Sequence, residues 1–176
     1  LTGAYATLVA PDSCSITAVG VANESTKAVI DKIYNYPAGL MNFTLACGTP
    51  GVSVTVEEYY YGTGKAAKDF VARKFTPYNN LYQNLDGAAV TDVAIGGSPA
   101  IKLVFSLTDG GPLDNDRVAN GTIEDPAGLG VQAQSGVLAN TGQTLRSQLF
   151  LSLSLSLIGL GLLVASAIKK RKISFR

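Results

Sequence analysis

Apolar and polar residues alternate along several short stretches of this chain. In residues 41–47 every second side chain is apolar, and the same holds for residues 52–56 and 101–107. Such alternation gives a β-strand one apolar face and one polar face. Turn-forming residues separate the runs, as at 96–99 (Gly-Gly-Ser-Pro). The pattern predicts an all-β domain over residues 1–130, built as an antiparallel β-sandwich of Ig-like or Greek-key type.

Residues 24–33 fit this pattern less well. Thr26, Val29, Ile30 and Ile33 have partial helical spacing. We therefore leave a short helix and an irregular segment equally open for this stretch.

The hydrophobic pattern changes near the C-terminus. Residues 149–168 form a run of 20 residues without a charge, which as a helix spans about 30 Å, the thickness of a bilayer's hydrocarbon core. The run predicts one C-terminal transmembrane helix, joined to the β domain by a linker at 131–148. Leucine and serine alternate over 151–157, so a β-strand is the alternative.

A basic tail at 169–176 follows the apolar run directly. It begins with Lys169, Lys170, Arg171 and Lys172. Basic residues stay on the cytoplasmic side of a membrane, so we expect this tail inside and everything before the run outside. The cluster is more simply a stop-transfer signal than a nucleic-acid patch, and we expect no nucleic-acid partner.

One polar spacer ahead of the apolar run stands the pentapeptide Leu138-Ala139-Asn140-Thr141-Gly142. This order of elements resembles the sorting signal that sortases cut, whose usual form is Leu-Pro-x-Thr-Gly. The resemblance implies that a sortase cysteine attacks the Thr141 carbonyl and that an amine of peptidoglycan or its precursor resolves the acyl-enzyme. Ala139 stands where the usual form has proline, which leaves the sortase class open. A plain single-pass membrane anchor is the alternative.

The net charge of the whole chain averages over two segments of opposite charge. The formal charge is +1, from 14 Lys and Arg against 13 Asp and Glu. Residues 142–176 hold six of the cations and none of the anions, so the preceding residues carry 8 − 13 = −5. The chain has no histidine, which excludes Ser-His-Asp and Cys-His catalysis and His-ligated zinc. Two cysteines are too few for a metal site with four thiolate ligands.

The two cysteines, Cys14 and Cys47, are 33 residues apart, and Cys47 continues the apolar register of its predicted strand. In an extracellular domain they most simply form one disulfide. Two buried free thiols are the alternative, and a redox pair is disfavoured because the spacing is not CxxC.

An acidic, glycine-rich stretch covers residues 107–126. Its carboxylates Asp109, Asp114 and Asp116 are the ligand type that calcium prefers, and they are the metal site that the sequence offers. The competing interpretation is a solvated turn in which aspartate and asparagine bond their own backbone. A hydrolase using Asp114 and Asp116 is disfavoured, since acids two residues apart on a turn do not face each other across a cleft.

The same stretch carries a family resemblance. Residues 108–126, TDGGPLDNDRVANGTIEDP, and residues 36–40, YPAGL, with Phe43, Cys47 and the run 50–56, resemble the bacterial choice-of-anchor U domain. The similarity covers roughly residues 12–130. Domains of this family stand just ahead of C-terminal sorting signals, so the resemblance implies a secreted β-rich module beside the envelope. It implies no catalytic residues.

Together these features predict a non-enzymatic bacterial cell-surface protein, anchored to the cell wall or held by a single membrane span with its N-terminus outside, that displays or spaces other parts. The expected partners are a sortase, peptidoglycan and the membrane. The alternative is an adhesin that binds a host or envelope ligand, a glycan or a protein, through tyrosines: Tyr59, Tyr60, Tyr61, Tyr78 and Tyr82.

Two further expectations concern the covalent state of the chain. It starts at Leu1 and its only methionine is Met41, so we expect a processed form or a piece of a longer protein. A Lys–Asn isopeptide crosslink, like those of some wall-anchored β-domains, is compatible with such a module. The sequence points to no particular residue triple for it, although an intact mass about 17 Da low would reveal it.

Overall fold

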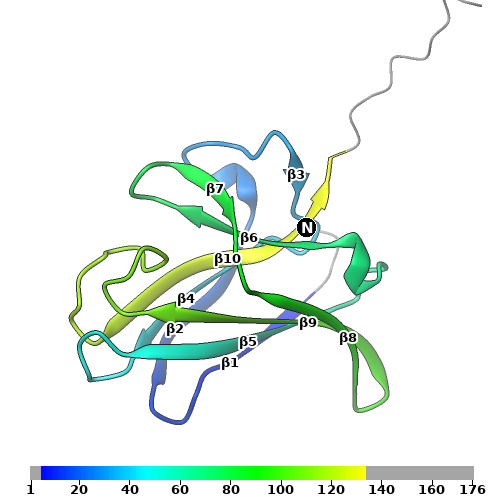
Figure 1. Ribbon diagram of the computed structural model, residues 1–176. Coiled ribbons are helices and arrows are strands. Elements are labelled where there is room, and N and C mark those ends of the chain that lie inside the picture. Colours follow the sequence, from blue (N-terminus) through cyan, green and yellow to red (C-terminus); the bar gives the residue numbers. More distant parts are fainter. Residues whose placement is uncertain (1–4, 134–176) are drawn as a thin grey trace, which may run out of the picture. The chain divides into compact units, whose positions relative to one another are not determined.

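Two antiparallel β-sheets pack face to face as a sandwich in the computed structural model, which describes residues 5–133 (Figure 1). The all-β sandwich expected from the alternating runs is confirmed. The three runs lie in β4 (Leu40–Ala46), β5 (Ser53–Tyr61) and β9 (Ser98–Thr108). Each of these strands turns its alternate apolar side chains toward the other sheet, which is why the period of two is visible in the sequence.

The first sheet has four strands in the order β1-β5-β9-β8, where β1 is Tyr5–Val9 and β8 is Ala89–Ile95. The second sheet has the order β2-β4-β10-β6-β7, with β3 paired to β10. Its remaining strands are β2 (Ser15–Ala22), β3 (Tyr34–Asn35), β6 (Val71–Thr76), β7 (Leu81–Asn84) and β10 (Thr122–Gln132). The chain crosses between the sheets repeatedly, so strands distant in sequence become neighbours.

The core lies between the two sheets. Its fully buried members include Leu45, Val56, Leu103, Ile123 and Leu129, which come from both sheets. A second, smaller cluster forms on the outer face of the second sheet around Tyr36, Leu40 and Phe75. The loop before β3 covers this outer face, so β6 is buried on both sides.

The outer cluster is closed by a polar network. The Arg73 guanidinium donates to Asp31 Oδ2 from Nε (3.1 Å) and Nη2 (2.6 Å), and Tyr36 Oη donates to the same oxygen at 2.8 Å. Arg73 also lies over the Tyr34 ring, 4.4 Å from its centroid. These contacts fix the loop on the sheet. Only a short 3₁₀ turn, η1 (Glu24–Thr26), forms in residues 24–33, so the helix left open for this stretch does not occur.

β10 is the central strand of the second sheet and runs to Gln132, within a compact unit that ends at Ala133. No helix in residues 5–133 is both long and apolar enough to cross a membrane. The predicted span at 149–168, the linker with its pentapeptide at 138–142 and the basic tail at 169–176 lie outside the described residues.

Candidate functional site

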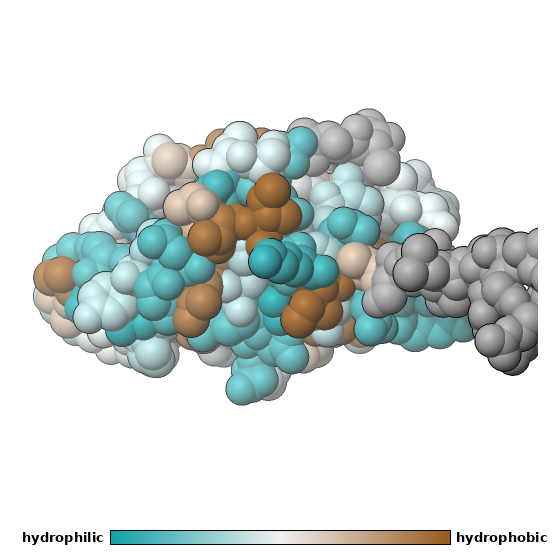
Figure 2. Space-filling model, turned by 90° about the horizontal axis from the view of Figure 1, so that it is seen from above, coloured by the Kyte–Doolittle hydropathy of each residue, from teal (hydrophilic) through white to brown (hydrophobic). Residues whose placement is uncertain are grey.

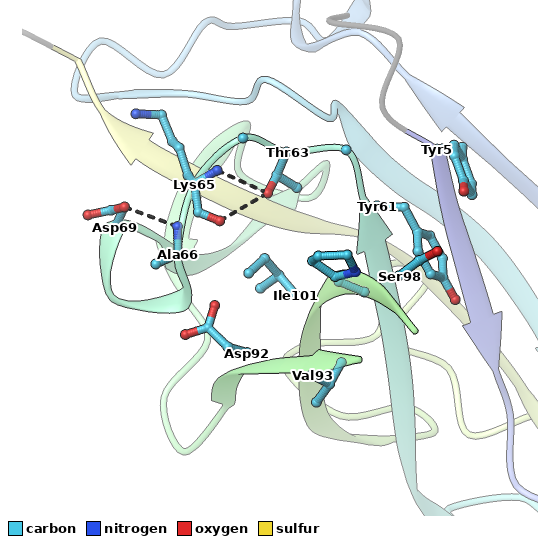
Figure 3. Close-up of a pocket in the computed structure, with 14 residues that line it drawn as sticks. Tyr5, Tyr61, Thr63, Lys65, Ala66, Asp69, Asp92, Val93, Ser98 and Ile101 are labelled. Carbon is cyan, nitrogen blue, oxygen red and sulfur yellow. Dashed lines mark hydrogen bonds between the residues drawn. The ribbon is translucent and has the colours of Figure 1, made fainter. Parts of the chain in front are cut away.

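An open hollow of about 740 Å³ lies where β5 ends and β8 turns into β9 (Figure 3). The loop 62–66 and the 3₁₀ turn η2 (Ala67–Asp69) form its other side. Tyr61 from β5 stacks on Tyr5 from β1 at one edge, with ring centroids 4.8 Å apart and planes 15° from parallel. Tyr5 is 65% exposed, so the pair presents an aromatic platform to solvent beside the hollow.

Two carboxylates stand on the opposite side of the hollow from the tyrosine pair in Figure 3. Asp92 on β8 accepts a hydrogen bond from the Ala67 N–H at 2.9 Å, and Asp69 accepts one from the Ala66 N–H at 3.1 Å. These bonds fix η2 and shape the wall. An aromatic platform facing polar groups across an apolar hollow is the chemistry that holds a sugar ring or a polar peptide.

The tyrosines singled out in the sequence do not form one cluster. Tyr60 is fully buried in the core, which corrects its interpretation as a surface aromatic. Tyr82 packs against Tyr36 and Phe75 on the outer face of the second sheet. Tyr78 is 72% exposed and lies under the Arg117 guanidinium. Of the predicted five, only Tyr61 borders the hollow, and its partner Tyr5 was not singled out.

The acidic stretch folds as a set of loops held by its own carboxylates. Asp109 is 2% exposed, and its Oδ2 accepts the N–H groups of Gly51 (2.7 Å) and Gly121 (2.8 Å), which lie on two different loops. Asp114, fully buried, accepts from Gly110 (2.8 Å) and Glu124 (3.0 Å). The turn interpretation is therefore right that these aspartates bond the backbone of their own stretch, and wrong that they are solvated, since both are buried.

Asp116 is exposed, and its oxygens accept from the Val118 N–H (2.9 Å) and the Asn120 side chain (2.8 Å). In the part of the chain that the structure describes, no group of three or more acidic or cysteine side chains is placed to hold a metal ion. Whether Asp109, Asp114 and Asp116 bind calcium is a question for melting-temperature measurements with and without the ion.

The pKa values of the two buried carboxyls move in opposite directions. For Asp109, burial raises the pKa, but the backbone N–H groups of Gly121, Gly51, Asn120 and Thr122 outweigh burial and leave the pKa below its usual range. For Asp114, burial is the largest effect and keeps the pKa raised. Asp109 is thus the anion around which the loops are organised.

Cys14 and Cys47 form a disulfide, with Cα atoms 4.1 Å apart. The predicted pairing is confirmed. Their chain neighbours Ser15 and Ala46 form the first pair of the β2–β4 ladder. The bond therefore closes the end of a strand pair whose edge member, β2, is exposed along almost all its length.

The sandwich interior also holds ionisable side chains that sequence reasoning missed. Glu58 on β5, Lys74 on β6 and Asp125 on β10 are each at most 1% exposed. Burial raises the pKa of Glu58 to about 8 and lowers that of Lys74 to about 7. The alternation through Val54 and Val56, continued two residues further, puts Glu58 on the inward face, and this signal was present in the sequence.

Exposed apolar side chains elsewhere are scattered. Over the face that carries β3 and β7, Figure 2 shows apolar residues in small groups separated by polar ones. Val29, Ile30, Ile33 and Leu81 are among the exposed large apolar residues. Small apolar groups broken up by polar residues are normal for a protein surface, so the hollow is the better candidate for a ligand.

Comparison of the chain with protein-family models, with curated proteins and with solved structures gives no match.

Proposed function

We propose that this chain is a non-enzymatic module of the bacterial cell surface, linked to the cell wall by a sortase that cuts after Thr141. The order of four sequence features carries this proposal: the pentapeptide 138–142, a polar spacer, the uncharged run 149–168 and the basic tail. In the proposed arrangement the run 149–168 is a transmembrane helix that holds the precursor until cleavage, with the tail inside.

Two observations on the domain support an extracellular location. The domain contains the Cys14–Cys47 disulfide, and disulfides form and persist in oxidising compartments. The resemblance to choice-of-anchor U domains, whose members stand ahead of sorting signals, agrees with the same position. The Ig-like or Greek-key subtype of the sandwich also belongs to this proposal, and the display or spacer role follows from a rigid β module placed next to the wall.

The cleavage step is tested by mass spectrometry of envelope digests from cells that contain a sortase. The expected product ends at Thr141 and carries wall material. The Thr141→Ala variant should fold normally but stay in the membrane fraction with residues 142–176 attached. Thr144→Ala, a matched change in the spacer, should be processed like the unaltered chain. Recovery of uncut chain in the presence of an active sortase would overturn the proposal.

A second candidate function is ligand binding at the hollow, which the Tyr5–Tyr61 platform favours. In this case the module is an adhesin for a glycan or protein, held by a plain membrane span. Glycan-array binding that is lost in Tyr61→Ala and kept in Tyr78→Ala supports it, because Tyr78 is exposed but is not among the lining residues. No binding above background to wall or host glycans counts against it.

A further inference from the structure

The strongest unexplained feature is a group of charges sealed between the two sheets. The side chains of Lys74 and Asp125 are both 0% exposed, and the Lys74 Nζ contacts the Asp125 Oδ1. Despite this contact, neither Asp125 oxygen makes a hydrogen bond. Burying two charges costs several kcal/mol for each ion, and oxygens without hydrogen bonds leave that cost uncompensated.

The strand register explains how the two side chains meet. Ala127 on β10 is paired with Lys74 on β6, so Asp125, two residues earlier, lies on the same face of the sheet and diagonally across from Lys74. That face is the inward one, since Ala127, Leu129 and Ala72 on it belong to the core. Both side chains therefore point toward the first sheet.

Glu58 belongs to the same group from the opposite sheet. It is flanked on β5 by the inward residues Val56 and Tyr60, is fully buried, and interacts electrostatically with Lys74. Its Oε2 accepts a hydrogen bond from the Tyr60 hydroxyl, while its Oε1 has no hydrogen-bond partner. A lysine, an aspartate and a carboxyl oxygen without a hydrogen-bond partner are thus buried together between the two sheets.

We infer that Lys74 and Asp125 join in an intramolecular isopeptide bond, with Glu58 as the group that moves the proton. The amine of Lys74 attacks Cγ of Asp125, the Nζ–Cγ bond forms and one Cγ–O bond breaks. One proton from Nζ and one from the carboxylic acid leave with that oxygen as water, and Glu58 returns to its starting protonation state. No oxidant, reductant or co-reactant is needed.

The protonation states at neutral pH suit this reaction. A pKa of about 7 leaves a substantial fraction of Lys74 as the neutral amine, which is the nucleophile. A pKa of about 8 keeps most of Glu58 protonated, so it can donate to the Asp125 oxygen. The product amide carries no charge, which removes the desolvation cost of the ion pair.

The test is an intact mass of the full chain, purified in detergent with its disulfide reduced. The expected mass is about 18 Da below the sequence mass, the loss of one water. In a tryptic digest, Lys74 resists cleavage and the peptide 74–102 is joined to the peptide that begins at Val118. A full sequence mass with these peptides separate overturns the inference, and this readout does not require any variant to fold.

Variants assign the roles. Lys74→Met and Glu58→Gln, which keep side-chain size, should both restore the sequence mass, and Glu58→Gln should retain the native circular-dichroism spectrum. Lys102→Met is the matched control, because Lys102 forms a surface ion pair with Glu57 at 2.6 Å. Its loss should leave the mass deficit of about 18 Da unchanged. A Glu58→Gln protein that still shows the deficit overturns the role of Glu58. The inference is independent of sorting at Thr141.

Discussion

Replacing Cys14 and Cys47 together by serine removes the disulfide crosslink at the end of the β2–β4 strand pair. The disulfide closes a loop of 33 residues. In the chain-entropy account, such a loop contributes about 3.7 kcal/mol at 25 °C, because the crosslink restricts the unfolded chain. This corresponds to roughly a 500-fold change in the unfolding equilibrium. For a domain of this size the melting temperature should fall by on the order of 10 °C.

The structure also predicts which strand is destabilised first when the disulfide is removed. β2 is an edge strand, bonded to β4 on one side only, and its residues are almost all exposed. It therefore buries little apolar area to hold it in place once the disulfide is gone. Amide hydrogen exchange in β2 should rise more than exchange in the central strand β10.

The assay is urea unfolding of the full chain in detergent, followed by tyrosine fluorescence, since the chain has eight tyrosines and no tryptophan. The unaltered chain with its disulfide reduced is the matched control and should unfold at the same urea concentration as the double variant. An unchanged midpoint with an unchanged slope would refute the loop-entropy reasoning. Amide exchange that is faster throughout the domain, with no larger increase in β2, would refute the prediction that β2 is destabilised first.

Three further predictions concern the acidic loops. Gly110→Ala should destabilise the domain by about 1–3 kcal/mol, more than Gly96→Ala. Both glycines have positive φ, but only at Gly110 would a Cβ meet backbone atoms, 2.6 Å from the Ala119 nitrogen further along the same connection between β9 and β10. Asp109→Asn should lower the melting temperature more than Asp116→Asn. The pKa of Asp109 is depressed in the folded state, so its contribution to the free energy of unfolding is complete above about pH 4 and is lost as the pH falls through the folded value. The Asp109→Asn variant should therefore lose less stability in acid than the unaltered chain. Stability that falls in parallel for the variant and the unaltered chain would contradict this. Millimolar calcium should leave the melting temperature unchanged, because the carboxylates already accept backbone N–H groups, and a clear rise would restore the calcium site.

The strands that the sequence predicted best are those with one apolar and one polar face. β4, β5 and β9 each turn one face to the core, so burial leaves a period of two in the sequence. β6 gave no such signal because the sheet buries one of its faces and the Tyr36 cluster buries the other. The proline and glycines of β10 looked like turn residues, yet Pro126 lies in a strand that is buried along most of its length.

The candidate sites were harder to predict for a different reason. The disulfide followed from the count and spacing of two cysteines, which needs no knowledge of packing. The buried trio of Glu58, Lys74 and Asp125 depends on which charged residues point inward, and charged residues are normally assigned to the surface. The hollow depends on Tyr5 and Tyr61, which are distant in sequence and meet only through the pairing of β1 with β5.

The position of β10 has a mechanical consequence. Tension on the chain beyond Ala133 reaches the domain first through this strand, which is hydrogen-bonded to β4 along Thr122–Ala127 and to β6 along Ala127–Gly130. A pull along the strand axis loads these bonds in parallel, as a shear, so several must fail together. A strand pulled at right angles to its axis would instead release its bonds one at a time. The sandwich is thus arranged to resist force at its C-terminal end.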